Sequence, residues 1–179
     1  MNRDELMELT RQAIRLVPNR EVLIVGSQSI LGTVAEDRLP ERATLSREAD
    51  IAPTRDDDDG TIATLIDVHL GEMSDFDRVN GFYAQGVSST TAVLPRGWER
   101  RATIVHPDGP GGGTAWFISP YDLCASKLVR GERKDIEFVS ALIECGIIEP
   151  HALSRIADRL PVAQNVKQIV QLRVAACAS

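Results

Sequence analysis

The feature that most constrains the fold of this chain is a short, unbroken apolar run, VLIV at positions 22–25, which stops at Gly26 and Ser27. A strand that is apolar on both faces is normally covered on both, so the run predicts a strand over 21–25 in the interior of a sheet. Glycine allows the chain to turn tightly after that strand. Ser27 belongs to a residue type that often caps helices, and we expect it to begin a short helix over 28–34.

A second strand is expected over 45–52, ended by Pro53, and it carries Glu48 and Asp50 two positions apart. Because successive side chains of a strand point to opposite faces, these two carboxylates share one face of the sheet. Two carboxylates beside a turn of small residues can hold a divalent metal ion. Taken alone, such a pair is more often solvated charge on an edge strand, so the rest of the chain must decide between the two interpretations.

Hydrophobic periodicity predicts an α+β fold for a single domain that spans residues 1–179. A sheet-containing core is expected over about 1–118, and a helical portion over about 119–179, which Ser119 begins as an N-cap. The expected helices are 3–17, 61–70, 119–130, 133–145, 150–160 and 163–176; the further strands are 82–88, 90–95, 100–106 and 114–119; and 71–82 is expected to be irregular.

Composition argues against several classes of function. The net charge of −6 and the pI near 5.1 do not suit a broad nucleic-acid-binding surface. No apolar run is long enough for a membrane helix and the N-terminus does not resemble a signal peptide, so we expect a cytoplasmic protein without membrane contact. Neither the cysteines nor the histidines have the spacing of a disulfide framework or a zinc site; they are Cys124, Cys145, Cys177, His69, His106 and His151.

Two polar segments are expected to be loops without a binding role. Residues 56–59 are four consecutive acids, a composition typical of a solvated loop rather than a metal site. The tract DGPGGG at 108–113 lacks the spacing and the lysine of a phosphate-binding P-loop, so it is interpreted as a flexible hairpin connection.

Positive charge gathers in one short segment, where Lys127, Arg130, Arg133 and Lys134 lie within eight residues. If a helix continued through Gly131, three of these side chains would lie on the same side of it, at positions i, i+3 and i+7. A basic ridge of that kind suits a triphosphate or an RNA end. It is equally compatible with a solvated helix face on which the lysines extend into water.

The order strand, Gly26-Ser27, helix, and then a strand with Glu48-Ala49-Asp50 resembles the nucleotidyltransferase superfamily with the polymerase-beta-like fold. Its signature is G-S or G-G followed by D-x-D or D-x-E, and here the first acid is a glutamate. The segment YDLCASKLVRGERKDIEFV at 121–139 is similar to the D-L-x-x-x-K-L…R-x-K-D-x-x-F-V segment of a bacterial branch of uncharacterised nucleotidyltransferase-like proteins related to AbiEii-type toxins. The resemblance covers roughly residues 20–145, and it implies an α+β fold with a nucleotidyltransferase-like mixed sheet flanked by helices.

The resemblance implies a nucleotide site that opens at the end of the first strand. Gly26 and Ser27 would contact the phosphates of a nucleoside triphosphate, and Lys127 would bind phosphate oxygens as a point charge. Arg130 and Lys134 would extend this cationic surface.

The resemblance also implies a metal-dependent reaction at the acidic strand. Glu48 and Asp50 would bind Mg²⁺, or Mn²⁺ in its place, and Asp135 would be a third acid that helps hold the metal or deprotonates the attacking hydroxyl. Asp67 and Glu72 are alternatives for the third acid. Asp135 could instead complement the first turn of its own helix.

We therefore expect a nucleotidyltransferase that moves a nucleoside monophosphate from an NTP to a hydroxyl acceptor. By resemblance, the acceptor would be a tRNA 3′ end and the protein the toxin of a toxin–antitoxin pair, with an antitoxin protein as its partner; a protein acceptor is an alternative. A second hypothesis is a catalytically inactive descendant that binds a nucleotide or a protein. A plain α+β domain without a site in this region is the third interpretation, and it predicts no cleft that joins Gly26, Asp50 and Lys127.

Overall fold

A computed structural model describes residues 1–55 and 60–178 of the chain, and the acidic run at 56–59 lies outside the described residues. Five strands form one mixed sheet in the order β3-β2-β1-β5-β4. They are β1 (Glu21–Val25), β2 (Glu48–Pro53), β3 (Tyr83–Gly86), β4 (Thr103–Val105) and β5 (Thr114–Phe117). The apolar run is thus the central strand, as its sequence predicts, and it pairs antiparallel with β2 and parallel with β5.

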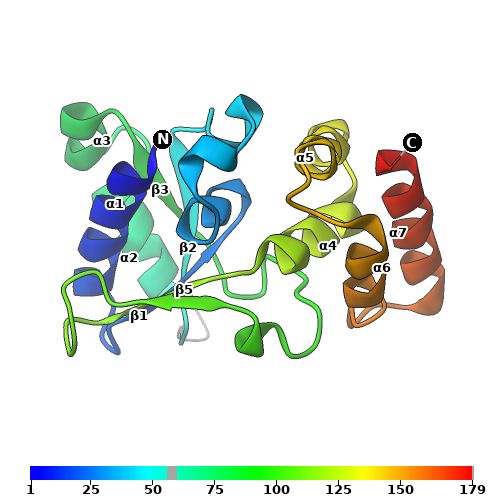
Figure 1. The fold of residues 1–179 in the computed structure, drawn as a ribbon. Helices are drawn as coiled ribbons and strands as arrows, with labels where there is room; N and C mark the ends of the chain where they lie inside the picture. The colour runs from blue at the N-terminus through cyan, green and yellow to red at the C-terminus, as the bar shows by residue number, and fades with distance from the viewer. Residues whose placement is uncertain (56–59, 179) are drawn as a thin grey trace.

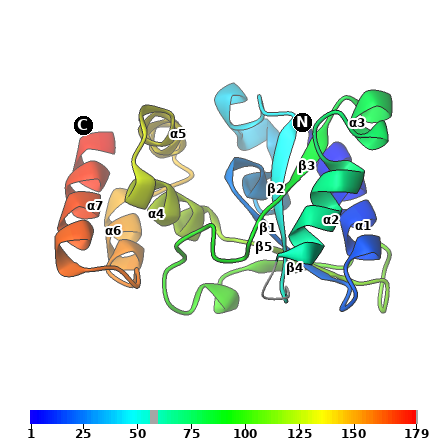
Figure 2. The ribbon, with the colours of Figure 1, turned by 180° about the vertical axis from the view of Figure 1, so that it is seen from behind.

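The two faces of β1 belong to two different hydrophobic clusters. Val22 and Ile24 pack with α1 (Arg3–Leu16) and α2 (Thr61–Leu70) on one face of the sheet. Leu23 and Val25 belong to the cluster that includes the C-terminal helices on the other face. Figures 1 and 2 show this arrangement, with the sheet between two groups of helices. A strand covered on both faces must be apolar throughout, which explains the unbroken run.

The C-terminal portion is helical, as expected, and the α+β fold class is confirmed. Its helices are α4 (Pro120–Arg130), α5 (Arg133–Glu144), α6 (Pro150–Ala157) and α7 (Gln164–Cys177). Ser119 caps α4 by accepting a hydrogen bond from the backbone N–H of Asp122. Gly131, with φ of 64°, ends α4, so the chain turns before α5 and no continuous helix passes through this glycine.

Several local predictions were wrong. The segment after β1 is a short 3₁₀ helix, η1 (Ser27–Gly32), with Gly26 at its cap position, so Ser27 does not cap an α-helix over 28–34. Residues 71–82 are not wholly irregular, since Ser74 caps α3 (Asp75–Asn80). Residues 90–95 form no strand, and of 100–106 only β4 is a strand, after a 3₁₀ turn, η4, at Trp98–Arg100.

Among the described residues, no helix has both the length and the apolar character needed to cross a membrane. All three cysteines are free. Cys124 lies on the buried face of α4, and burial raises the pKa of its thiol, so it is an unreactive core residue.

Candidate active site

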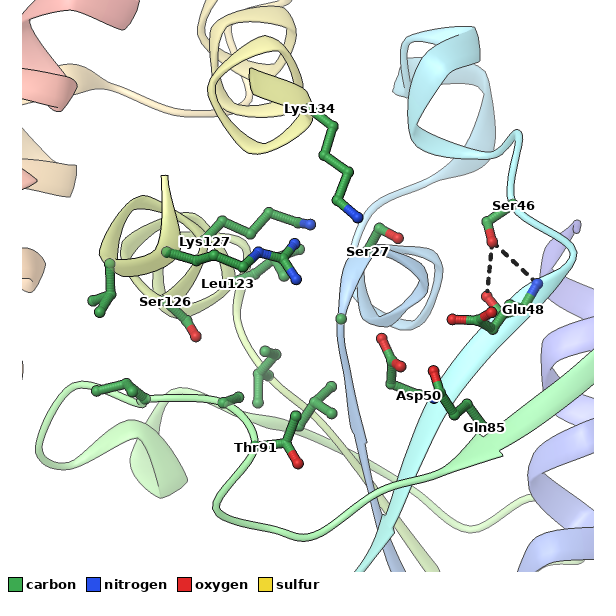
Figure 3. Close-up of a pocket in the computed structure, with 17 residues that line it drawn as sticks. Ser27, Ser46, Glu48, Asp50, Gln85, Thr91, Leu123, Ser126, Lys127 and Lys134 are labelled. Atoms are coloured by element: carbon green, nitrogen blue, oxygen red, sulfur yellow. Dashed lines mark hydrogen bonds between the residues drawn. The ribbon is translucent and has the colours of Figure 1, made fainter. Parts of the chain in front are cut away.

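A cavity of about 560 Å³ lies between the sheet and the helices α4 and α5. It joins the end of β1, the exposed face of β2, one residue of β3, the segment 91–93 and the facing sides of the two helices (Figure 3). Apart from the candidates for the third acid, every candidate site residue lines it: Gly26, Ser27, Glu48, Asp50, Lys127, Arg130 and Lys134. The cleft that the plain-domain interpretation excludes is therefore present.

The acidic wall of the cavity is formed by β2. Glu48 and Asp50 lie on the same face of the strand, while Ala49 and Ile51 are buried on the other. Burial raises the pKa of Asp50, and the neighbouring charge of Glu48 raises it further. The cations across the cavity act in the opposite direction without cancelling this effect. The site therefore holds negative charge that a bound metal ion would stabilise.

Gly26 makes room for this acidic wall. Val25 is paired with Asp50 across β1 and β2, so the glycine follows directly beside the carboxylate. A Cβ atom at Gly26 would lie 1.9 Å from Oδ2 of Asp50, and φ is +67°, a left-handed conformation that favours glycine. The glycine is therefore required by the Asp50 side chain as well as by the turn.

The cationic wall is formed by α4 and α5. Lys127 and Arg130 come from the last turn of α4, and Lys134 reaches from the first turn of α5 toward Ser27 (Figure 3). The Lys127 side chain is only 13% exposed, which does not fit a surface lysine extended into water. It lies 4.8 Å from the centre of the Phe138 ring. Although Gly131 breaks the helix, the three cations still line the same cavity.

Asp135 lies behind the cations and does not line the cavity. Its side chain is 0% exposed and accepts hydrogen bonds from Nζ of Lys127 at 3.3 Å and from Nε and Nη2 of Arg130 at 2.7 and 2.6 Å. It also accepts one from the backbone N–H of Glu132 at 3.2 Å. Burial alone would raise the pKa of Asp135, but the hydrogen bond from Arg130 and the two positive charges outweigh it and hold the pKa below its ordinary value.

This placement makes Asp135 an ionised partner that orients the cations. Its role as a catalytic acid or base stays a prediction, and that role would require a route from the buried carboxylate to the reacting atoms. The two alternatives for the third acid, Asp67 and Glu72, do not line the cavity either. Asp67 accepts a hydrogen bond from the backbone N–H of Gly86 at 3.2 Å and so helps fix α2 against β3.

Four polar residues line the cavity that sequence reasoning did not single out: Ser46, Gln85, Thr91 and Ser126. Gln85 is paired in register with Asp50, and its amide end points toward the two carboxylates (Figure 3). The alternation in YAQG could have placed Tyr83 and Gln85 on one face of a strand. It could not have shown that this strand lies beside β2.

The donor set fits a single magnesium ion. Of the described residues, only Glu48 and Asp50 bring carboxylates to the cavity, and no group of three or more histidine, cysteine or acidic side chains arranged to hold a metal occurs elsewhere among them. Mg²⁺ is commonly bound by one or two carboxylates, with water and substrate phosphates as its remaining ligands. Glu48 and Asp50, facing a cationic wall that suits phosphate, match that pattern.

Of the comparisons with known proteins, the one with protein families agrees with this geometry. No curated protein and no solved structure matches the chain. The sequence does match, over residues 4–174, a family described as nucleotidyltransferases of unknown function. The match supports the superfamily that the motifs resemble, whereas the relationship to the AbiEii-type branch stays a proposal. Because the match extends over nearly the whole chain, this protein belongs to the nucleotidyltransferase family DUF6036.

Proposed function

We propose that this protein is an Mg²⁺-dependent nucleotidyltransferase, with Mn²⁺ as an alternative metal, which moves a nucleoside monophosphate from an NTP to a hydroxyl acceptor. The observation that carries the proposal is the pairing of opposite charges across one cavity. Glu48 and Asp50 face Lys127, Arg130 and Lys134. A triphosphate with its metal ion needs both kinds of wall, because the acids hold the metal and the cations neutralise phosphate oxygens.

The chain's residues would bind and orient the triphosphate. Arg130 presents a planar guanidinium that can bind two phosphate oxygens, while Lys127 and Lys134 act as point charges. The ion pairs with Asp135 fix Lys127 and Arg130 before substrate binds, so less side-chain freedom is lost on binding. The metal would neutralise charge on the phosphates.

In the proposed reaction, the acceptor hydroxyl attacks the α-phosphorus and the bond to the β-phosphate breaks. Pyrophosphate leaves, and the hydroxyl proton passes to a base or to water. Catalysis of this type depends mainly on positioning and on neutralising charge, which is what the two walls provide.

The proposal extends to an acceptor and a partner that the resemblance to AbiEii-type toxins suggests. The acceptor would be a tRNA 3′ end in the cytoplasm, and an antitoxin protein would hold the enzyme inactive. A protein hydroxyl is the alternative acceptor. The net charge of −6 favours a protein over an RNA acceptor, because an acidic protein does not offer a broad nucleic-acid-binding surface.

The direct test is to incubate the protein with each labelled NTP, Mg²⁺ and either total tRNA or total cell protein. Label transfer that depends on the metal and disappears in Asp50→Ala would support the proposal. Absence of transfer with every NTP and both acceptor pools, from protein shown to be folded, would count against catalysis.

One observation favours a second function, that of a nucleotide-binding or protein-binding module without catalysis. The side chain next to Asp50 on β3 is the neutral Gln85, so the cavity has two carboxylates among the described residues and no third. Calorimetry of NTP binding with and without Mg²⁺ separates the two functions. Tight binding that does not depend on the metal, together with no transfer, is the result expected of a binding module.

A further inference from the structure

Strand β3 supports the acidic wall residue by residue. It runs parallel to β2, and Tyr83 is paired in register with Glu48, as Gln85 is with Asp50. The hydroxyl of Tyr83 donates a hydrogen bond to Oε2 of Glu48 at 3.0 Å. The other oxygen, Oε1, has no hydrogen-bond partner within the part of the chain that the structure describes, and Glu48 lines the cavity.

This hydrogen bond bears on Glu48, which stands where the D-x-D signature that the chain resembles has its first aspartate. A glutamate side chain has one more rotatable bond than an aspartate, so fixing its carboxylate costs more conformational freedom. A ligand that moves binds a metal ion weakly, and carboxylate ligands are therefore commonly held by a hydrogen bond from a neighbouring group. The backbone of Glu48 is fixed too, because Ser46 Oγ contacts its N–H at 3.1 Å and its carbonyl oxygen at 3.2 Å.

Tyr83 is itself held on several sides. Its backbone N–H donates to the carbonyl oxygen of Arg47 at 2.9 Å, and the Arg47 guanidinium lies 5.5 Å from the centre of its ring. Arg47 is fixed in turn by an ion pair with the nearly buried Asp77 and by a hydrogen bond to the carbonyl oxygen of Gly81 at 3.0 Å. The hydroxyl of Tyr83 is thus presented to Glu48 by a supported ring.

We propose that Tyr83 is a positioning residue for the metal site, which holds one oxygen of Glu48 in place and leaves the other to bind the cation. Tyr83 does not line the cavity, so it acts through Glu48 and touches neither metal nor substrate. The inference rests on the proposed function in one respect, namely that Glu48 and Asp50 bind a divalent metal.

The experiment measures Mn²⁺ and Mg²⁺ affinity by calorimetry, with a non-hydrolysable NTP analogue present, and needs no turnover. Tyr83→Phe removes the hydroxyl and keeps the ring under Arg47. The matched control is Tyr121→Phe, because Tyr121 is the chain's other tyrosine and its hydroxyl accepts a hydrogen bond from the backbone of Glu149, away from the cavity. We expect Tyr83→Phe to weaken metal binding by roughly 10- to 100-fold, as for other groups that support a ligand, and Tyr121→Phe to leave it unchanged.

A second pair of variants tests whether the effect passes through Glu48. In the Glu48→Ala background, Tyr83→Phe should change metal affinity by less than about twofold, because the oxygen that the hydroxyl holds is gone. The same loss in both backgrounds, or no loss in the parent, would overturn the positioning role while leaving the metal site intact. Failure of the parent protein to bind either metal would overturn the proposed function as well, and so the two failures are distinguishable.

Discussion

At Asp50, burial and the neighbouring charge of Glu48 both raise the pKa of the carboxyl group. The folded protein therefore holds this carboxylate in a less favourable environment than the unfolded chain does. The proposed function accounts for this arrangement, since a metal ion bound between Glu48 and Asp50 would remove the repulsion. Without the metal ion, the unfavourable environment of the ionised Asp50 carboxylate lowers the free energy of unfolding.

Asp50→Asn should consequently stabilise the metal-free protein at pH 7, by about 1 kcal/mol, the usual size of a favourable single substitution. A raised folded-state pKa means that ionising Asp50 lowers stability as pH rises through that pKa. The gain of the variant should therefore be full at neutral pH and vanish below about pH 4, where the carboxyl is protonated in both states. Urea unfolding at pH 7 and pH 3.5 checks this, with the exposed Asp37→Asn as control. A variant that is less stable than the parent at pH 7 would contradict the argument.

Asp135 shows the opposite shift, because its hydrogen bond from Arg130 and the charges around it outweigh burial and keep the pKa low. Asp135→Asn should lower the free energy of unfolding by about 3 kcal/mol at pH 7, since a buried ion pair loses its anion. With a lowered folded-state pKa, the stability that Asp135 contributes is present above about pH 4 and is lost as the pH falls through the folded value. The difference between parent and variant in urea unfolding should therefore shrink in acid.

The same variant separates two roles for Asp135. If the carboxylate orients Lys127 and Arg130, the affinity for NTP falls together with the rate of transfer. If it is a catalytic acid or base, the rate falls while NTP affinity, measured by calorimetry, stays close to that of the parent.

Single residues were predictable from the sequence where a local pattern singled them out. The E-x-D pair and the cationic segment around Gly131 stand out in this way, and the structure brings the pair and three of the cations, Lys127, Arg130 and Lys134, to one cavity. Tyr83 and Gln85 were not predictable as neighbours of the acids, because the register of β2 with β3 joins residues 35 positions apart. The burial of Asp135 likewise depends on tertiary packing that its helical pattern does not reveal.

At the scale of elements, prediction succeeded where the hydrophobic pattern had a clear period or clear ends. The expected bounds of β1 and α2 agree with the structure. The segment 90–95 has strand-like residues but pairs with no strand, because strand propensity has an effect only where a sheet edge is available. Its residues Thr91, Ala92 and Val93 line the cavity instead.

The turn between β1 and η1 gives a prediction about an element boundary. Gly26→Ala should cost about 1–2 kcal/mol for its left-handed backbone and a further amount for displacing the Asp50 carboxylate, since the new Cβ would lie 1.9 Å from Oδ2. Gly146→Ala is a matched control, because φ there is +69° and a Cβ would meet nothing within 4 Å. Thermal unfolding should show the larger loss at Gly26.

The affinity for Mg²⁺ should also distinguish Gly26→Ala from Gly146→Ala. Gly26→Ala should weaken Mg²⁺ affinity by at least about tenfold, because it moves a ligand, whereas Gly146→Ala should not change it. Equal effects of the two substitutions on stability and metal affinity would mean that Gly26 matters only for its backbone conformation.

At the scale of the whole molecule, the two walls of the cavity come from two parts of the fold. The acids lie on the sheet, and the cations lie on α4 and α5. The apolar residues of these two helices pack in one hydrophobic cluster with Leu23 and Val25 of β1. The sequence predicts both parts, including the α+β class. It does not show that α4 packs beside the turn after β1, because that contact arises only when the helical portion folds onto the sheet.

This division of charge predicts that metal and nucleotide bind cooperatively. Mg²⁺ alone meets two carboxylates, and NTP alone places its phosphates near those same acids, so each should bind weakly and raise the melting temperature little. When both are present, the metal links the phosphates to the acidic wall while the cations hold them from the other side.

At a free concentration of the NTP–metal complex 100 times its Kd, the stabilisation should reach about 2.7 kcal/mol. A thermal-shift matrix of Mg²⁺ against a non-hydrolysable NTP measures this, and Lys134→Ala should reduce the joint shift more than the shift with Mg²⁺ alone. Shifts that simply add would show that metal and nucleotide do not share the cavity.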